Sequence, residues 1–315
     1  MELHILLDCI LVVLSILMLW KGADWLVDSA AEIAHSFKVS DLIIGLTVVA
    51  FGTSAPEFAV TISAAFTNQT DISIGNVIGS NIFNLGFILG GTAIIRPITV
   101  SQKLFNRDGL FLLLSTALIF LLFFGVNGWN IEDSFTQFEG FILFFLLVGY
   151  IFFLFIKKDP PEEVRPNTAT KSSYLFFFIG LILIVSGGHL MVDHASNVAR
   201  FIGISDWVIA VTIVAAGTSA PEFATSISAA LKGRHGIAIG NLIGSDLFNL
   251  LGVLGLAGII NPSSISQDIY SSTFVLVLMV GLTLLMMRTF WRISRIEGFI
   301  LVSINLVRWY YDLSA

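Results

Sequence analysis

The chain has little charge, one cysteine and seven prolines, and these scarcities exclude several classes of protein. Only 12% of its 315 residues are charged, about half the share in an average soluble domain, whereas 56% are hydrophobic. The single cysteine, Cys9, excludes an intrachain disulfide and a cysteine-based metal cluster, and we expect it to act as apolar packing. A mean hydropathy of +0.91 indicates a polytopic membrane protein.

Two further patterns are missing from the sequence. Alternating apolar and polar residues, which are typical of membrane strands, do not occur, and lipid requires a backbone that satisfies its own hydrogen bonds. The first twenty residues have neither a basic leader nor a small-residue cleavage signature, so we interpret them as a retained span and not as a signal peptide. The sequence therefore predicts an all-α polytopic membrane protein.

Apolar windows of about 20 residues are long enough to cross a bilayer as helices. They lie near 3–26, 41–66, 72–95, 108–126, 137–156, 173–198, 206–231, 237–260, 270–288 and 295–313. The prediction is therefore ten transmembrane helices.

Lysine and arginine are distributed unevenly among the predicted loops. If the N-terminus is outside, the cytoplasmic loops carry 13 of these residues and the outer side carries two. The positive-inside rule then places both termini outside the cytoplasm. We expect an integral protein of the cell (inner) membrane.

A linker over 157–173 divides the chain into two similar halves, 1–156 and 174–315, and we interpret it as a solvated cytoplasmic connection. Residues 28–97 align without a gap to 193–262, with 36 identities over 70 positions. Because each half has five spans, an odd number, the second half should enter the membrane in the opposite sense. The prediction is two inverted five-helix repeats, with a substrate site at their interface near the membrane midplane.

The most specific shared motif is GTSAPEF, which stands at Gly52–Phe58 and again at Gly217–Phe223. One interpretation is an ordinary helix start, because the motif has the spacing of a capping box and a proline suits a first turn. However, Pro56 has no N–H and crowds the carbonyl four residues earlier, so the helix should break near Gly52–Ser54. Interrupted transporter helices use the freed carbonyls to bind cations.

Each copy of the motif places a glutamate, Glu57 or Glu222, inside a predicted span. A buried carboxylate costs several kcal/mol unless it is paired or neutralised, and two together repel unless a cation or protons lie between them. Two carboxylates with carbonyl and hydroxyl oxygens form a hard ligand set that suits Ca²⁺. Neither segment offers a histidine or cysteine for a softer metal. We predict a divalent-cation site shared by the two halves.

A second repeated motif reads GNVIGSNIFN over 75–84 and GNLIGSDLFN over 240–249. Its polar residues recur every four positions and form one stripe on a helix. Asn76 and Asn241, the first members, have two open interpretations, as cation ligands or as interhelical hydrogen-bonding groups. The paired glycines predict close helix approach. The later members of the stripe are predicted to be cation ligands: Ser80, Asn84, Ser245 and Asn249.

Asp246 breaks the symmetry of the repeats, because Asn81 occupies the equivalent position. It is either a third carboxylate near the site or a residue that lines an aqueous path. Asp28 and Asp193 are also repeated, near the ends of the first and sixth spans. We interpret them as helix-end residues in preference to ion-entry residues.

These doubled motifs resemble the cation/calcium antiporter superfamily, and within it the prokaryotic Na⁺/Ca²⁺ exchangers. The two alpha-repeats would correspond to about 40–97 and 205–262. The resemblance implies a secondary antiporter that needs no cofactor, is not an enzyme, and extrudes Ca²⁺ by exchange for Na⁺ through alternating access. The first and sixth spans would then slide across the site as gates.

The resemblance also implies a set of ligands. Ca²⁺ would be held by the carboxylates of Glu57 and Glu222 and by the carbonyls of Thr53 and Thr218. Na⁺ would use overlapping ligands: the hydroxyls of Thr53, Ser54, Ser80, Thr218, Ser219 and Ser245, the carbonyls of Ala50 and Ala215, and the side chains of Asn84 and Asn249.

One position departs from the pattern. Many relatives, including the potassium-dependent exchangers, carry aspartate where this chain has Asn249, which argues against K⁺ dependence, although Asp246 nearby weakens that argument. A proton-driven Ca²⁺ antiporter and a carboxylate-lined cation channel stay as alternatives. The expected partners are Ca²⁺, Na⁺ and the lipid bilayer, with no nucleic acid and no obligate protein partner.

Overall fold

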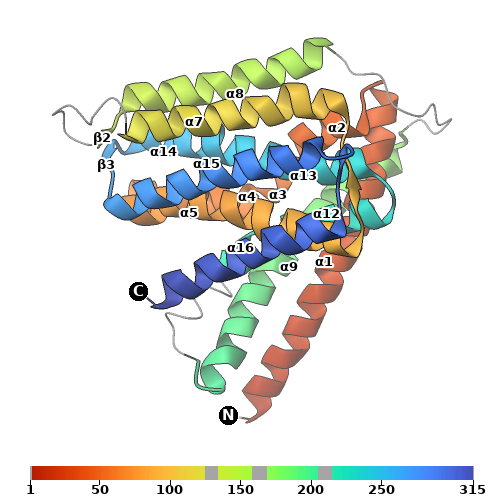
Figure 1. Cartoon of the computed structure of the whole chain (residues 1–315). Coiled ribbons are helices and arrows are strands. Elements are labelled where there is room, and N and C mark those ends of the chain that lie inside the picture. The colour runs from red at the N-terminus through yellow and green to blue at the C-terminus, as the bar shows by residue number, and fades with distance from the viewer. Residues whose placement is uncertain (1, 125–133, 158–168, 205–214, 315) are drawn as a thin grey trace.

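The computed structural model describes residues 2–124, 134–157, 169–204 and 215–314, which are mostly helical (Figure 1). Residues 158–168 of the predicted linker and 206–214 of the predicted seventh span lie outside these ranges. The first half contains α1 (Glu2–Ser36), α2 (Asp41–Ile44), α3 (Ala50–Thr53), α4 (Ala55–Phe66), α5 (Thr70–Phe83), α6 (Gly90–Ile95), α7 (Leu110–Phe124) and α8 (Gln137–Lys157). The second half contains α9 (Lys171–Phe201), α11 (Ala215–Thr218), α12 (Ala220–Leu231), α13 (His235–Leu247), α14 (Leu254–Ile260), α15 (Gln267–Arg288) and α16 (Arg295–Ser314).

The described residues also include π-helical segments that join short helices into longer rods. Gly45–Val49 connects α2 to α3, Asn84–Leu89 connects α5 to α6, and Phe248–Val253 connects α13 to α14. A further segment, Leu104–Gly109, precedes α7. Such segments are rare in helices and frequently mark functional sites. Two of them begin at or beside the asparagines that end the predicted polar stripes.

The strands of the described chain are short and lie between helices. β1 (Ile98–Thr99) pairs antiparallel with β4 (Arg292–Ile293), and β2 (Ser134–Phe135) pairs antiparallel with β3 (Ser263–Ser264). Two residues are far too few to cross a bilayer as a strand. The prediction of an all-α polytopic membrane protein is confirmed.

Seven described helical segments are long and apolar enough to cross a membrane, and the bent pair Asp41–Thr53 and Ala55–Phe66 makes an eighth if it is counted as one span. These eight coincide with eight of the ten predicted spans. The predicted tenth span corresponds to the helix α16, which contains charged residues and is not among these eight, so its crossing of the membrane stays a prediction. Of the predicted seventh span, the structure describes α11 and α12.

Helix α1 is longer than the prediction, because it continues to Ser36 and does not end near residue 26. Its later turns contain acidic residues that end the apolar run. These residues find partners on other helices: Lys232 Nζ lies 2.8 Å from Asp28 Oδ2, and the Ser173 hydroxyl donates to Glu32. The helix therefore continues beyond the point at which hydropathy alone would end it.

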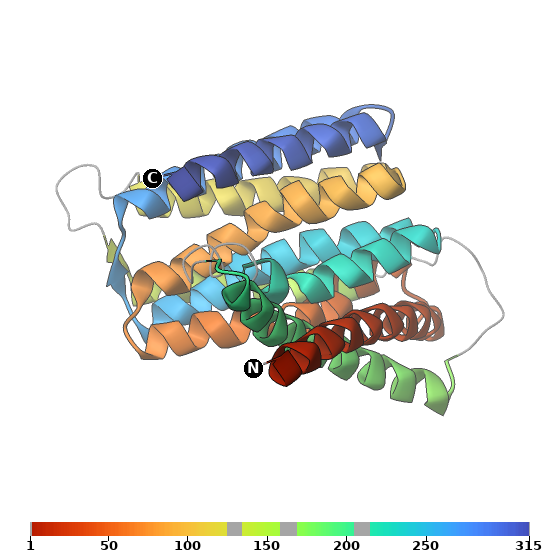
Figure 2. The same ribbon diagram turned by 90° about the horizontal axis from the view of Figure 1, so that it is seen from below.

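The helices form two groups. In Figure 1, α7, α8, α13 and α15 run in similar directions as a stack, whereas α1 and α9 lie side by side and leave the stack at an angle. Figure 2 places α15 and α16 on the side of the molecule opposite α1. A Cβ added at Gly180 of α9 would lie 2.8 Å from both the Gly22 carbonyl oxygen and the Leu26 nitrogen. Helices α1 and α9 therefore pack with their backbones almost in contact.

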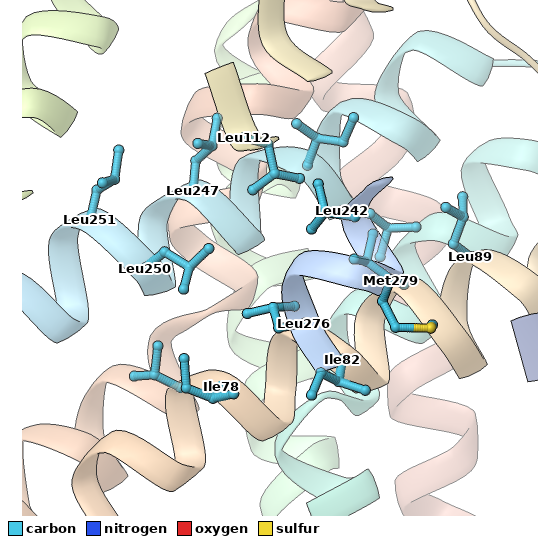
Figure 3. Packing of buried hydrophobic residues seen from close by; sticks show 14 of the residues in the cluster. Ile78, Ile82, Leu89, Leu112, Leu242, Leu247, Leu250, Leu251, Leu276 and Met279 are labelled. Carbon is cyan, nitrogen blue, oxygen red and sulfur yellow. The ribbon is translucent and has the colours of Figure 1, made fainter. Parts of the chain in front are cut away.

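The larger apolar core lies between α5, α7, α13 and α15, and it encloses α13 most completely. Every residue from Ile237 to Leu247 is buried, including the polar ones. Added Cβ atoms at Gly240 and Gly244 would lie 2.8 Å and 2.6 Å from the Leu42 and Leu46 carbonyl oxygens, so the predicted close approach is present in the second motif. The same prediction is wrong for the first motif, because no described atom lies within 4 Å of a Cβ added at Gly75 or Gly79. Figure 3 shows side chains of this core converging: Ile78, Ile82, Leu89, Leu112, Leu242, Leu247, Leu250, Leu251, Leu276 and Met279.

Candidate functional site

Both copies of GTSAPEF interrupt a helix at the serine. Ser54 has φ −79° and ψ 10°, and Ser219 has φ −88° and ψ 8°, so neither is fully helical. The helices on the two sides of Ser54 are bent by 51°. Because the proline that follows each serine has no N–H, the hydrogen-bond ladder cannot continue through this point. The break lies where the sequence predicts it.

The alternative interpretation of the motif as a capping box is wrong for the serines. Neither hydroxyl caps its own helix. Instead, Ser54 Oγ donates to Glu222 Oε1 at 2.9 Å, and Ser219 Oγ donates to Glu57 Oε1 at 2.9 Å. Each serine therefore orients the glutamate of the other half, and the two copies of the motif form one site.

Other hydroxyl groups surround the same carboxylates. Ser245 Oγ donates to Glu222 Oε1 at 3.3 Å, and Thr53 Oγ1 lies 3.4 Å from Ser245 Oγ. The Thr218 side chain lies close to Glu57, as Thr53 does to Glu222. Both glutamates are 1% exposed. The structure thus brings most of the predicted hydroxyl ligands to one buried place.

Asn76 and Asn241 connect the helices that carry the site. Asn76 Nδ2 donates to the Glu57 carbonyl at 3.3 Å and to Thr61 Oγ1 at 3.0 Å. Asn241 Nδ2 makes the equivalent bond to Ser226 Oγ at 3.1 Å, and its Oδ1 accepts from Thr53 Oγ1 at 3.0 Å. These contacts favour the interpretation of both asparagines as interhelical hydrogen-bonding groups.

A second polar network lies beside the glutamates and also joins the two halves. Asn84 Nδ2 donates to Asp246 Oδ1 at 3.0 Å, and Asn81 Nδ2 donates to the Asp246 carbonyl at 3.1 Å. Asn249 Nδ2 donates to Asn81 Oδ1 at 3.3 Å. All four residues are at most 1% exposed. Asp246 is therefore a buried member of a network and not a residue at the surface.

Five buried oxygen atoms in these two networks have no hydrogen-bond partner among the residues that the structure describes. Their side chains all carry at least one partnered atom, so each residue is held in place while one oxygen stays unused. Buried polar atoms are normally satisfied, and an unsatisfied one in a native protein requires an explanation. A cation bound by oxygen would supply it. The atoms are Glu57 Oε2, Glu222 Oε2, Asp246 Oδ2, Asn84 Oδ1 and Asn249 Oδ1.

The remaining predicted ligands are placed as follows. Ser80 is buried on α5. The Ala50 carbonyl oxygen already accepts hydrogen bonds from the Ser54 N–H at 3.0 Å and from Thr53 Oγ1 at 3.3 Å. An ion bound to this oxygen would therefore displace the Thr53 hydroxyl. Ala215 is the first residue of α11, directly after 205–214, which the structure does not describe. The roles assigned to these residues stay predictions.

Asn81 is the member of the site that the sequence reasoning did not select. In the sequence it stands out only as the symmetry partner of Asp246, whereas in the structure it hydrogen-bonds both Asp246 and Asn249. The aligned position was the signal that could have identified it. Within the described residues, no three histidine, cysteine, aspartate or glutamate side chains form a metal-binding group, so a bound cation would rely mainly on neutral oxygens around the carboxylates.

Comparison with known proteins supports the same grouping of residues into two halves. A family model for sodium/calcium exchanger proteins matches residues 8–156 and 172–311. The chain is 36% identical to the putative antiporter CaxA of Alkalimonas amylolytica, over 94% of this chain and 96% of that protein. It is 32% identical to the sodium/calcium exchanger MaX1 of Methanosarcina acetivorans, over 95% of this chain and 96% of that protein.

The fold is similar to that of a solved exchanger. A structure of the sodium-calcium exchanger NCX_Mj soaked with zero Na⁺ and Ca²⁺ has a TM-score of 0.84 and 32% identity, and the match covers 96% of this chain and 98% of that one. The similarity extends over nearly the whole length of the chain, in sequence and in fold. This chain therefore belongs to the sodium/calcium exchanger family, a family of transporters and not of enzymes.

Proposed function

We propose that this protein exchanges Na⁺ for Ca²⁺ across the cell membrane by alternating access, and that it extrudes Ca²⁺ electrogenically. The observation that carries the proposal is the set of buried oxygens on Glu57, Glu222 and their neighbours that have no hydrogen-bond partner within the described parts of the chain. Carboxylate, hydroxyl and amide oxygens are the donors that Ca²⁺ and Na⁺ accept. The donor set fits hard cations, and its two glutamates match the charge of one Ca²⁺.

The contacts between the halves explain why the site needs both repeats. Glu57 and Glu222 each depend on a serine from the other half for their orientation. The exchanger NCX_Mj has been studied in crystals soaked with Na⁺, Ca²⁺ and Sr²⁺. The same ions are the expected substrates or substrate analogues here.

Coupling follows from the charge of the empty site. Two buried carboxylates without a cation repel each other in a low-dielectric environment, so the empty site should cross poorly between its inward-open and outward-open states. Ca²⁺ and Na⁺ compete for the same oxygens, so one must leave before the other binds. This exclusion prevents leak and favours a carrier over a channel.

The gating elements are α1 and α9 in this proposal. They pack on each other through Gly22 and Gly180 and lie at an angle to the other helices (Figure 1). Helix α1 also contacts α12, which carries Glu222. A pair that moves as one body relative to the remaining helices would open the site first to one side and then to the other.

The coupling ion is tested by Ca²⁺ flux in proteoliposomes under Na⁺, K⁺ or pH gradients imposed one at a time. We expect an outward Na⁺ gradient to drive Ca²⁺ uptake, and K⁺ or pH gradients of the same size to drive much less. Ca²⁺ uptake driven by the pH gradient alone would identify the protein as a proton-driven antiporter. Flux that does not saturate and shows no counterflow would assign a channel.

The glutamates are tested by Glu57→Gln and Glu222→Gln. Each variant keeps the shape of the side chain and removes one charge, so we expect Ca²⁺ flux to be lost in both. Asp71→Asn is the matched control, because it removes an exposed carboxylate of α5. Robust Na⁺-driven Ca²⁺ exchange in both glutamine variants would refute the assignment.

The orientation in the membrane rests on the distribution of lysine and arginine. We propose that both termini face away from the cytoplasm. A protease-cleavable tag at either terminus should then be cut when the protease is added outside cells whose wall has been removed and whose cell membrane is intact. If both tags are cut only after the cell membrane is permeabilised, both termini face the cytoplasm and the proposed orientation is wrong.

A further inference from the structure

We infer that this protein binds an anionic phospholipid, with an acyl chain in an apolar groove beside α1 and the headgroup on Arg96 and Arg295. The inference goes beyond the proposed function, because it concerns a ligand other than the transported ions. It holds whether or not the chain exchanges Na⁺ for Ca²⁺. The groove has a volume of about 800 Å³, which is within the range of cavities that hold small-molecule ligands.

The groove follows one face of the rod that α5 and α6 form. Phe83, Phe87, Gly91 and Ile94 of this rod line it, at intervals of three or four residues, and α1, α12 and α16 supply most of the other lining residues. At 1.5 Å per residue, the eleven steps from Phe83 to Ile94 span about 17 Å, close to half of the hydrocarbon thickness of a bilayer. The groove therefore has the length of an acyl chain in one leaflet.

The polar side chains that line the groove are already bonded to one another. Lys232 Nζ lies 2.9 Å from Asp24 Oδ1, and Ser228 Oγ donates to the same oxygen at 3.1 Å. The other lining residues are aliphatic or aromatic, apart from Gly91. Such a surface suits hydrocarbon and not a hydrated ion.

Two arginines lie at one end of the groove, beside its lining residues. Arg96 Nη1 donates to the carbonyl of the lining residue Leu231 at 2.7 Å. Arg295 Nη2 donates to the Ile95 carbonyl at 3.4 Å, one position from the lining residue Ile94. Both side chains are exposed, and among the described residues neither has a carboxylate partner. Backbone carbonyls thus orient both guanidinium groups without neutralising their charge.

This charge favours an anionic headgroup over a zwitterionic one. A guanidinium group can donate two parallel hydrogen bonds to a phosphate. Lys232 contributes little, because Asp24 and Asp28 both pair with it. In the proposed orientation this end of the groove faces the cytoplasm, and basic sites between helices on that side bind anionic headgroups.

A helix from a second copy of the chain is the competing occupant. It would cover the apolar lining but would bring no anion to the two arginines. An anionic phospholipid satisfies both observations, because its chain and its phosphate are joined in one molecule. The charge at the end of the groove therefore selects the lipid.

Tryptophan fluorescence can report whether the groove is occupied, because Trp20 and Trp309 line it. The full chain is placed in phosphatidylcholine vesicles, and phosphatidylglycerol or phosphatidylcholine that is brominated in mid-chain is added as a quencher. We expect phosphatidylglycerol to bind more tightly, by about fivefold for each arginine. Equal quenching by the two brominated lipids would overturn the inference.

The position of the lipid is tested by Trp20→Phe with Trp309→Phe. This variant keeps four of the six tryptophans, and none of these four lines the groove. We expect the difference between the two brominated lipids to disappear. A difference that survives would place the anionic lipid elsewhere and would overturn the inference.

The headgroup contact is tested by Arg96→Gln with Arg295→Gln, which should remove the preference for phosphatidylglycerol. Lys38→Gln with Lys157→Gln is the matched control, because it removes the same charge from exposed residues that do not line the groove. We expect the control to keep the preference. An equal loss in both pairs would show that the lipid responds to general surface charge, against the inference.

The acyl-chain contact is tested by Gly91→Leu. A Cβ added at Gly91 would meet only Phe223, at 3.6 Å, which is an ordinary contact, so a larger side chain extends into the groove without moving a helix. We expect the preferential quenching by phosphatidylglycerol to be lost. Gly149→Leu on α8 is the control, because no described atom lies within 4 Å of its added Cβ. Preferential quenching that persists in Gly91→Leu would exclude the groove as the site, and none of these measurements depends on transport.

Discussion

In several side chains of this site, one polar atom makes a hydrogen bond within the protein, and the other is the atom that the proposed function assigns to an ion. In Glu57 and Glu222, Oε1 accepts a hydrogen bond from a serine hydroxyl of the other repeat, whereas Oε2 has no partner among the described residues. Hydrogen bonds to charged groups are shorter and stronger than those between neutral groups. A serine in each half therefore fixes the orientation of a carboxylate in the other half before the ion arrives, which lowers the cost of binding.

Removing either serine hydroxyl should weaken Ca²⁺ binding. For Ser54→Ala and for Ser219→Ala we expect about a tenfold rise in the Ca²⁺ concentration for half-maximal flux, the equivalent of one hydrogen bond to a charged group. Titration of Ca²⁺ counterflow measures it. Ser63→Ala, an exposed serine of α4, is the control. Variants of Ser54 and Ser219 that both match this control would show that the crossed hydrogen bonds contribute nothing to binding.

At the scale of the helices, the site exists because several of them are interrupted. The helices α4 and α12 begin directly after the breaks at Ser54 and Ser219, and they carry the two glutamates in their first turns. Two π-helical segments begin where the polar stripes end. Helices α1 and α9 are different, since they are long, continuous and packed through glycine. The interrupted helices carry the predicted cation ligands, and the continuous pair is the one that the proposed function assigns to gating.

Gly180→Ala should damage the packing of α1 on α9. The added methyl group would lie 2.8 Å from two backbone atoms of α1, so one helix must shift, and we expect a lower Tm and slower exchange. Thermal unfolding in detergent and Ca²⁺ flux measure the two effects. Gly281→Ala on α15 is the matched control, because no described atom lies within 4 Å of its added Cβ. Equal effects of the two substitutions would contradict the role of this contact.

The whole molecule is less symmetric than its repeats. Lys232, at the end of α12, lies 2.9 Å from Asp24 and 2.8 Å from Asp28 of α1. The equivalent position in the first half is Thr67, which has no charge to offer α9. The charge distribution predicts that Lys232 is cytoplasmic, so this ion pair would attach α1, a gating helix in the proposed function, to α12 on the cytoplasmic face.

Lys232→Thr introduces the residue that stands at the equivalent position of the first half. It should change the apparent Ca²⁺ affinity on one face of the membrane relative to the other. We expect the ratio of apparent Ca²⁺ affinities on the two faces to shift by about two- to fivefold, which is the range for partly exposed ion pairs. Flux in vesicles of defined orientation measures this ratio. The shift should shrink at high salt, and Asp28→Lys with Lys232→Asp should reverse it. An unchanged ratio would show that the pair does not bias the gate.

The sequence by itself determined the membrane class, the two repeats, the breaks at the prolines and the paired glutamates. These features follow from hydropathy, from the stereochemistry of proline and from repetition, which are properties of short segments. Tertiary structure alone decided which atoms meet: Ser54 with Glu222, 168 positions apart, and Asn84 with Asp246, 162 positions apart. It also decided that α1 continues past its apolar run, that Asn81 joins the network of Asp246 and Asn249, and that Lys232 pairs with Asp24 and Asp28 of α1. No local pattern encodes these contacts, because each depends on how one half of the chain packs against the other.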